Sequence, residues 1–273
     1  MENIREKAVE TVISSWRLIP LLATSGGLTW LAREFLFEGP LVAQDVEAWG
    51  VFFSVFGILY AIVLGFVIMQ ALERLSLLRQ TIDSEINALQ DVRDFTIYLD
   101  DQEETRREIW RELLVYVRSV VEQEWAEMRH PSRKCDDDTS PELENLIKAT
   151  NKISAANESD SVALSAIIGH IGEITAFRTR RICTAQEHTE KQLVYLLEFM
   201  SCVLVGGLIL TVVQSAFVHY MMILCMAIAV YFSLKILKDL DHPLSGAWNV
   251  SPHPFQKLVS SLEKHISSHG LND

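Results

Sequence analysis

The sequence lacks the short motifs that mark most enzymes and cofactor-binding domains. Its spacing shows no phosphate-binding glycine loop, no HExxH pair, no EF-hand loop and no serine–histidine–aspartate arrangement. The four cysteines form no CxxC or Cys/His ligand pattern, so we expect four free thiols rather than a metal site or a disulfide framework. These absences argue against an enzyme and against a bound cofactor.

Charge is missing from two long stretches of the chain. Residues 48–72 carry no charged side chain and residues 192–234 carry only Glu198, although the protein has 36 acidic and 24 basic residues. A bilayer core about 30 Å thick needs roughly 20 apolar residues of helix to cross it. The first stretch is long enough for one crossing. The second is about twice too long for one, so it is expected to fold back as a hairpin.

A third uncharged stretch, residues 18–32, is shorter and contains proline and glycine. Arg17 and Arg33 flank it, and arginine side chains can reach outward from the ends of a short membrane helix. We interpret it as the first membrane helix. A cleaved signal peptide is the alternative, but the apolar run is short for one and no clear cleavage site follows.

Basic residues are absent between Arg33 and Arg74 and again between Lys191 and Lys235. They occur instead at the N-terminus, in the long middle segment and at the C-terminus. The positive-inside rule places these three regions in the cytoplasm, which requires four crossings. We therefore expect a multi-pass protein of the cell inner (plasma) membrane with both termini cytoplasmic.

The predicted fold is an all-α membrane protein with a long cytoplasmic helical domain between the second and third crossings. The chain then divides into a cytoplasmic N-terminus at 1–15, transmembrane helices 1 and 2 within 16–72, a cytoplasmic helical domain at 73–190, transmembrane helices 3 and 4 within 191–237, and a cytoplasmic C-terminal tail at 238–273.

The middle segment is rich in helix formers. The second membrane helix has no Gly or Pro to stop it and is expected to continue into the cytoplasm, followed by an amphipathic helix over 102–128. Ser140 and Pro141 resemble the cap and first residue of a further helix that reaches about Ala156. A last long helix is expected to begin after Asp160.

Residues 73–190 hold 24 acidic and 15 basic side chains, a net charge of −9. Such a surface repels a phosphate backbone, which argues against nucleic acid as a partner. Most of these charges are expected to form a solvated face.

Three bulky apolar residues recur four apart on the second membrane helix, at Ile58, Ile62 and Phe66. This spacing stacks them on one face. Gly57 and Gly65 are small enough to let a neighbouring helix approach closely. On spacing alone, plain helix packing is a better explanation of such a stripe than a pore is.

Two runs of sequence resemble a known family. IVLGFV at 62–67 is similar to the second-helix signature of bestrophin channels, and DLDHPLSGAWNVSPHPF at 239–255 resembles a stretch of a largely prokaryotic bestrophin-like family. The order of elements is also similar over roughly residues 45–262. The resemblance implies a homo-oligomer, with a pentamer favoured, in which Ile58, Ile62 and Phe66 form an apolar pore neck. A single four-helix subunit with such a stripe has no room for a water-filled path.

The resemblance also includes a glutamate near the start of the cytoplasmic segment and arginines near its end. Here these are Glu85 and Arg178, Arg180 and Arg181. The helices that carry them run side by side if both enter the membrane. We interpret the four residues as inter-helix ion pairs that hold the two helices in register.

Three acidic residues near the membrane boundary remain. Glu198 is either an interfacial side chain that reaches toward water or a polar contact in the pore or between subunits. Animal bestrophins hold calcium soon after the fourth membrane helix, where this chain offers only Asp239 and Asp241. Calcium needs six to eight oxygen ligands. No regulatory calcium site is therefore expected there, and the aspartates at 136–138 are expected to form a solvated turn.

The resemblance implies a channel that conducts inorganic ions across the lipid bilayer, with chloride as the expected ion. The acidic cytoplasmic segment would instead attract cations, so selectivity stays open. The main alternative is a membrane-anchored scaffold or signalling protein whose acidic helical bundle binds a partner. A transporter or membrane enzyme is a third reading, but only the first helix shows the interruption that transporters of this size usually have.

Overall fold

The computed structural model describes residues 46–129, 140–211, 213, 215–245 and 248–268, with Thr24, Gly27, Trp30 and Leu31. Within these ranges the protein is helical and contains no strand. The expected first membrane helix lies almost wholly outside the described residues, and the aspartates at 136–138 lie outside them as well.

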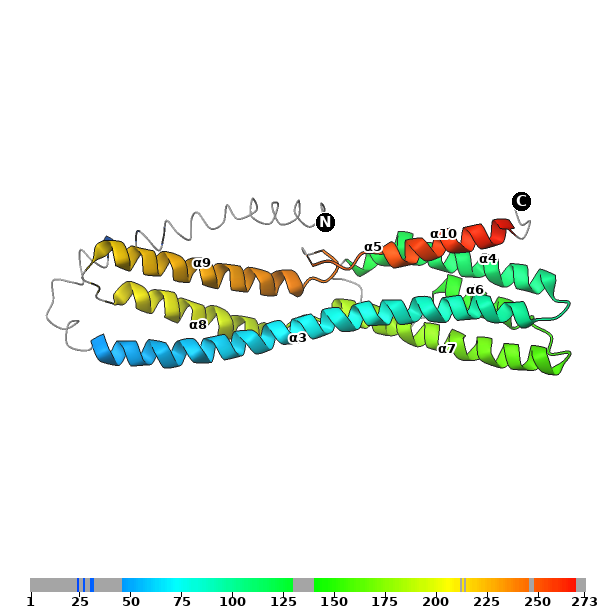
Figure 1. The fold of residues 1–273 in the computed structure, drawn as a ribbon, viewed down its shortest axis with the longest axis horizontal. Coiled ribbons are helices and arrows are strands. Elements are labelled where there is room, and N and C mark those ends of the chain that lie inside the picture. Colours follow the sequence, from blue (N-terminus) through cyan, green and yellow to red (C-terminus); the bar gives the residue numbers. More distant parts are fainter. Residues whose placement is uncertain are drawn as a thin grey trace. The chain divides into compact units, whose positions relative to one another are not determined.

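Helix α3 runs without a break from Val46 to Phe95 and is 50 residues long (Figure 1). At 1.5 Å per residue it measures about 75 Å, more than twice the thickness of a bilayer core. Its first half is uncharged from residue 48 to residue 72, and its second half is rich in charge. The prediction that this helix continues without interruption past its uncharged segment is confirmed.

The chain divides into two compact units. The first comprises residues 1–73 and 188–248, and the second comprises residues 74–187 and 249–273. Helix α3 contributes residues to both. The C-terminal segment that the sequence analysis treated as a tail belongs in part to the second unit, where it forms helix α10 (His253–Ser268).

The first unit contains the expected hairpin, formed by α8 (Lys191–Leu210) and α9 (Ala216–Leu240) (Figure 1). The Oγ atom of Ser215 accepts a hydrogen bond from the backbone N–H of Val218 and caps α9. In the described part of the chain, three helices are long and apolar enough to cross a membrane; they contain the first half of α3, α8 and α9. A fourth crossing would have to come from the N-terminal stretch.

The second unit packs the second half of α3 with the remaining helices. They are α4 (Glu103–Ser119), the π-helical turn η3 (Val120–Glu124), α5 (Trp125–Met128), α6 (Pro141–Thr150), α7 (Glu158–Gln186) and α10, with a short 3-10 turn η2 (Thr96–Tyr98) after α3.

The start of α6 matches the prediction, because the Oγ atom of Ser140 accepts the backbone N–H of Leu143 at 3.3 Å and Pro141 is the first helical residue. The helix ends earlier than expected, at Thr150 rather than near Ala156. The side chain of Asn157 caps the next helix by accepting the backbone N–H of Asp160.

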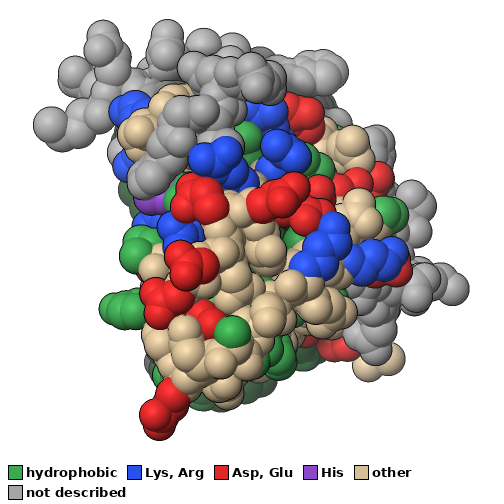
Figure 2. Space-filling view, turned by 90° about the vertical axis from the view of Figure 1, so that its right-hand side faces the viewer, with side chains coloured by type: hydrophobic (Ala, Val, Ile, Leu, Met, Phe, Trp, Pro, Cys, Tyr) green, Lys and Arg blue, Asp and Glu red, His purple; other side chains and the backbone are tan. Residues whose placement is uncertain are grey.

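Helix α10 packs on α4 and η3 through a stripe of buried apolar side chains, Phe255, Leu258 and Leu262. The ring of Phe255 meets Trp125 edge-on with centroids 6.1 Å apart. On the surface, Arg118 of α4 binds Glu263 of α10 at 2.6 Å. Figure 2 shows the right-hand side of Figure 1, where acidic and basic side chains are interspersed with scattered hydrophobic ones. That mixture fits a solvated face.

The expectation of four free thiols is wrong. Cys183 of α7 is disulfide-bonded, whereas Cys202 and Cys225 are free. Whether two cysteines pair depends on which elements tertiary packing brings within about 6 Å, and spacing along the sequence does not reveal that.

Candidate pore helix and buried charge network

The three expected neck residues lie on an exposed side of α3. Ile58, Ile62 and Phe66 are 62%, 51% and 69% exposed, which is unusual for side chains of this size and apolarity. The opposite side of the same helix is buried, with Tyr60 and Val67 at 7% and 3% exposed. Within the described part of the chain, the stripe therefore does not contribute to the core of its own subunit.

The exposed side of α3 changes character along the helix. Residues at spacings of three and four continue the stripe past Phe66, first as Met69 and then as Glu73, Gln80 and Asp83, all exposed. Because these spacings return to the same face, one side of a single helix is apolar in the membrane segment and polar beyond it.

Among the described residues, no other helix approaches either of the expected packing glycines. A Cβ atom added at Gly57 or Gly65 would meet no atom within 4 Å. The close approach occurs instead on α8, where a Cβ atom at Gly207 would overlap the ring of Phe53 from α3. The Gly206–Gly207 pair in an otherwise bulky helix was the sequence signal for this contact.

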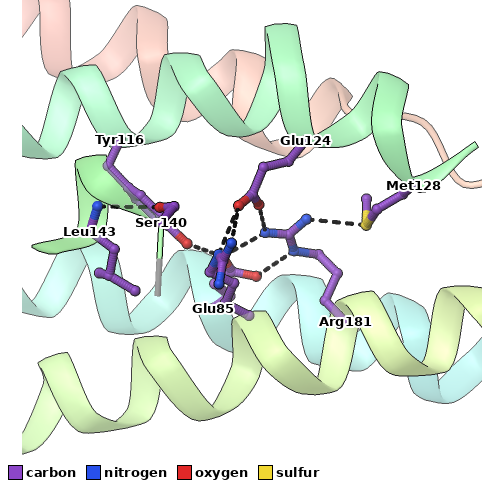
Figure 3. A network of polar contacts seen from close by, with 8 residues as sticks. Glu85, Tyr116, Glu124, Met128, Ser140, Leu143 and Arg181 are labelled. Atoms are coloured by element: carbon purple, nitrogen blue, oxygen red, sulfur yellow. Dashed lines mark hydrogen bonds and ion pairs between the residues drawn. The ribbon is translucent and has the colours of Figure 1, made fainter. Parts of the chain in front are cut away.

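In the second unit, Glu85 and Arg181 form a fully buried, two-pronged ion pair between α3 and α7 (Figure 3). The Nε atom of Arg181 donates to Oε2 of Glu85 at 2.7 Å, and a terminal guanidinium nitrogen donates to Oε1 at 3.2 Å. Both side chains are 0% exposed. Parallel guanidinium–carboxylate bonds of this kind fix orientation as well as distance.

A second carboxylate, Glu124 of η3, joins the two arginines. It accepts hydrogen bonds from Arg181 at 2.8 Å and from Arg178 at 2.6 Å. The phenol of Tyr116, on α4, donates to Glu85 at 2.8 Å. We define these five residues as the buried charge network: two carboxylates, two guanidinium groups and one phenol, which together carry no net charge.

The remaining surroundings of Arg181 also satisfy its guanidinium group. It contacts the sulfur of Met128 at 3.4 Å (Figure 3). It also lies 5.4 Å from the ring centroid of Phe255. Four helical segments and α10 thus enclose one arginine. Such an enclosed, fully bonded cluster is suited to hold helices in register rather than to act on a substrate.

Arg180 takes no part in the network. It is exposed on α7, and no ion pair of Arg180 occurs in the described part of the chain. Consecutive residues of a helix point about 100° apart, so Arg180 and Arg181 cannot both face α3. Arg178 faces the network but pairs with Glu124 rather than with Glu85.

Sequence reasoning missed Glu124 and Tyr116. Glu124 interrupts the apolar stripe that Val117, Val120 and Met128 form at spacings of three and four, and this was the available signal. It is also the last residue of the π-helical turn, which inserts extra backbone into a continuous helix and changes the direction in which the following side chains point.

The network shifts the pKa values of its members. Burial alone would raise the pKa of Glu124, but the charges of Arg181 and Arg178 and their hydrogen bonds outweigh it, so the pKa lies below its ordinary value. Burial and the neighbouring carboxylate of Glu85 raise the pKa of Tyr116 well above its ordinary value. Burial alone would lower the pKa of Arg181, yet Glu85 and Glu124 raise it. At neutral pH the network is therefore fully ionised at Glu124 and Arg181, with a neutral phenol.

The acidic residues near the membrane boundary lie in the first unit. Glu198 is exposed and, with Asp239 and Asp241, lines a cavity of about 1100 Å³ between α8 and α9, which Thr24 of the N-terminal stretch also lines. The backbone N–H of Thr189 donates a 2.5 Å hydrogen bond to Oδ1 of Asp241, which ties the start of the α8 segment to the end of α9. Among the described residues, no group of three or more potential ligands is placed to hold a metal ion.

Comparisons with known proteins by sequence and by structure indicate the same family. A sequence model of the bestrophin-like domain matches residues 19–255. The structure resembles two single-residue variants of a bacterial bestrophin homologue from Klebsiella pneumoniae, each at 16% identity. One gives a TM-score of 0.66 and covers 93% of this chain and 99% of that one; the other gives 0.65 and covers 92% and 98%. A crystal structure described as a membrane protein gives 0.65 at 15% identity, covering 94% and 99%.

No curated protein sequence matches the chain. The likeness to solved structures establishes the fold, and the sequence model covers most of the chain. Together with three helices apolar enough to cross a bilayer, these findings describe a membrane-embedded protein. The chain belongs to the bestrophin-like family.

Proposed function

We propose that the chain is one subunit of a homo-oligomeric ion channel of the inner membrane, with a pentamer favoured, whose pore is lined by α3. The observation that carries the proposal is the exposed stripe of Ile58, Ile62 and Phe66 on a helix whose opposite side is buried. Large apolar side chains left open in this way find partners when copies of α3 surround a common axis. Both termini are proposed to lie in the cytoplasm.

The stripe would form a hydrophobic neck. A ring of apolar side chains gates by dewetting, because a narrow apolar passage holds water and ions only when it widens. Gly57 and Gly65 would let neighbouring copies of α3 approach closely, since a Cβ atom at either position meets no atom of the described residues within 4 Å. The change from apolar to polar beyond Met69 would mark the inner mouth of the neck.

The buried charge network supports the same arrangement. A pore-lining helix must keep its rotation about its own axis. A rotation by the angle between two consecutive residues would point a neighbouring side chain, instead of Ile62, at the pore axis. Arg181 and Glu85 fix α3 against α7 a few turns beyond the neck. We propose that this pair sets the rotation of α3 and so the aim of the neck residues.

Chloride is the ion we propose, on the family resemblance. A cation is the second candidate, and a specific observation favours it: Glu73 and Asp83 are exposed on the side of α3 that continues the stripe. Rings of acidic side chains at a pore mouth raise the local concentration of cations.

The experiment is ion flux through purified protein in liposomes, under chloride and potassium gradients separately. Chloride flux in the parent supports the proposed ion. If potassium moves instead, and Asp83→Asn reduces its flux while Glu104→Gln, a change at an exposed carboxylate on α4, does not, then the cation assignment replaces it. An intact oligomer that conducts neither ion would contradict the channel proposal and favour the scaffold alternative.

A further inference from the structure

The cavity between α8 and α9 is polar at one end and apolar at the other. The charged side chains in its lining, and one histidine, lie in the half of the cavity nearer the start of α8 and the end of α9: Glu198, Lys235, Lys238, Asp239, Asp241 and His242. Beyond them the walls are formed by uncharged residues such as Val205, Ile209 and Val230. The cavity is therefore amphipathic along the helix axes.

Its dimensions match one leaflet of a bilayer. The lining follows α8 from Val194 to Ile209, which at 1.5 Å per residue is about 22 Å. Half of a hydrocarbon core is about 15 Å, which leaves a few ångströms for a headgroup. A volume of about 1100 Å³ is at the upper end of ordinary ligand pockets.

The charges at the polar end are mixed. Lys238 and Lys235 would attract a phosphate, whereas Glu198, Asp239 and Asp241 would repel a purely anionic headgroup. A headgroup that carries both a phosphate and an ammonium group complements both sets. A primary ammonium donates hydrogen bonds to carboxylates, and a quaternary one cannot.

We propose that this cavity binds a phospholipid with a primary amine in its headgroup, phosphatidylethanolamine, with its phosphate at Lys238 and its ammonium at Glu198. An acyl chain lies along the apolar walls between α8 and α9. This assigns a binding role to Glu198 that is separate from the pore and does not depend on ion conduction.

The test is native mass spectrometry of the delipidated oligomer with phosphatidylethanolamine, phosphatidylglycerol and phosphatidylcholine of identical acyl chains. The parent is expected to bind phosphatidylethanolamine about tenfold more tightly than the other two, the scale of one charge-assisted hydrogen bond. Lys238→Gln is expected to weaken phosphatidylethanolamine binding about tenfold. Glu198→Gln is expected to abolish the preference over phosphatidylglycerol.

The matched control is Lys191→Gln, which removes an exposed lysine from the same end of α8 without touching the cavity lining. It is expected to bind as the parent does. Equal affinity for the three lipids would overturn the proposal, as would a headgroup preference that survives Glu198→Gln. Absence of any retained lipid would also overturn it and would favour a protein segment as the occupant.

Discussion

At the scale of single residues, Arg181 explains why the second unit has one arrangement rather than several. Its guanidinium group has donors directed at Glu85, Glu124 and Met128, and no rotation of a neighbouring helix preserves all three contacts. A buried ion pair adds little net stability over apolar packing, because both charges lose their water. Removing one partner is costly, since the other charge then stays buried and unpaired.

We therefore expect Glu85→Gln to destabilise the protein by about 3–5 kcal/mol, because it leaves the buried guanidinium of Arg181 without its main counter-charge. The free energy of unfolding, measured by denaturant titration of the solubilised oligomer, checks this. Arg180→Gln, one residue away but exposed, is the control and should change stability by less than about 0.5 kcal/mol. Equal stability of Glu85→Gln and the parent would show that the pair does not hold the helices.

The lowered pKa of Glu124 predicts a pH dependence. A carboxylate whose pKa is depressed in the folded state stabilises the protein at pH values above its pKa in the unfolded state. That contribution is lost as the pH falls through the pKa of the folded state. This loss of stability is thus expected as the pH falls below 4.5, the ordinary pKa of a glutamate. Unfolding temperatures of the parent and of Glu124→Gln should differ at neutral pH and converge in acid. A difference that stays constant down to about pH 3 would contradict the assigned shift.

The residues of the network were only partly predictable. Glu85 and Arg181 stand out because they lie on two helices that must pair. Arg180 stands out in the sequence as clearly as Arg181 does. Consecutive residues of a helix point about 100° apart, so the two arginines can be told apart only when the side of α7 that faces α3 is known. The position of Glu124 in the network depends on the π-helical turn, and no local sequence pattern predicted that turn.

At the scale of elements, α3 and α8 are held together by size complementarity and one polar contact. Phe53 fills the space that Gly207 leaves, and Ser201 and Tyr60 share a buried hydrogen bond of 3.1 Å farther along the pair. Because α8 thus packs on the side of α3 opposite the stripe, this contact decides which face of α3 remains open.

Adjacent glycines give an internally controlled test of that packing. Gly207→Ala is expected to destabilise by roughly 1–3 kcal/mol, because the new methyl group collides with the Phe53 ring. Gly206→Ala meets no atom within 4 Å and should stabilise the helix by about 0.5–1 kcal/mol. Thermal unfolding of both variants measures the difference.

Combining Gly207→Ala with Phe53→Leu should recover much of the loss, since a smaller side chain then faces the methyl group. Two alanine variants of equal stability would mean that α3 and α8 do not approach at Gly207.

The elements themselves were largely predictable, for particular reasons. Helices α3, α8 and α9 follow from long uncharged runs, and the start of α6 follows from the Ser140–Pro141 cap. Helix α10 was interpreted as a tail, although Phe255, Leu258 and Leu262 show helical spacing. The sequence of these sixteen residues does not show which element they pack against. The disulfide bond of Cys183 was not predicted either, because the sequence does not show which elements pack together.

At the scale of the whole molecule, two units share α3 and act on it differently. The first unit leaves one side of α3 uncovered, and the second holds the same helix through the buried charge network. The proposed oligomer is the arrangement that would cover the open stripe. Subunit number and ion choice depend on how copies assemble, and a single chain does not determine either.

The most direct test of the account is ion flux through liposomes that hold the parent, Ile62→Ala or Met222→Ala. Ile62 is an exposed neck residue of α3, whereas Met222 is similarly exposed on α9, away from the proposed axis. Shrinking a neck residue widens the apolar constriction and eases wetting, so Ile62→Ala should conduct more than the parent and Met222→Ala should equal it. If Ile62→Ala leaves the flux of a conducting parent unchanged, α3 does not form the pore neck.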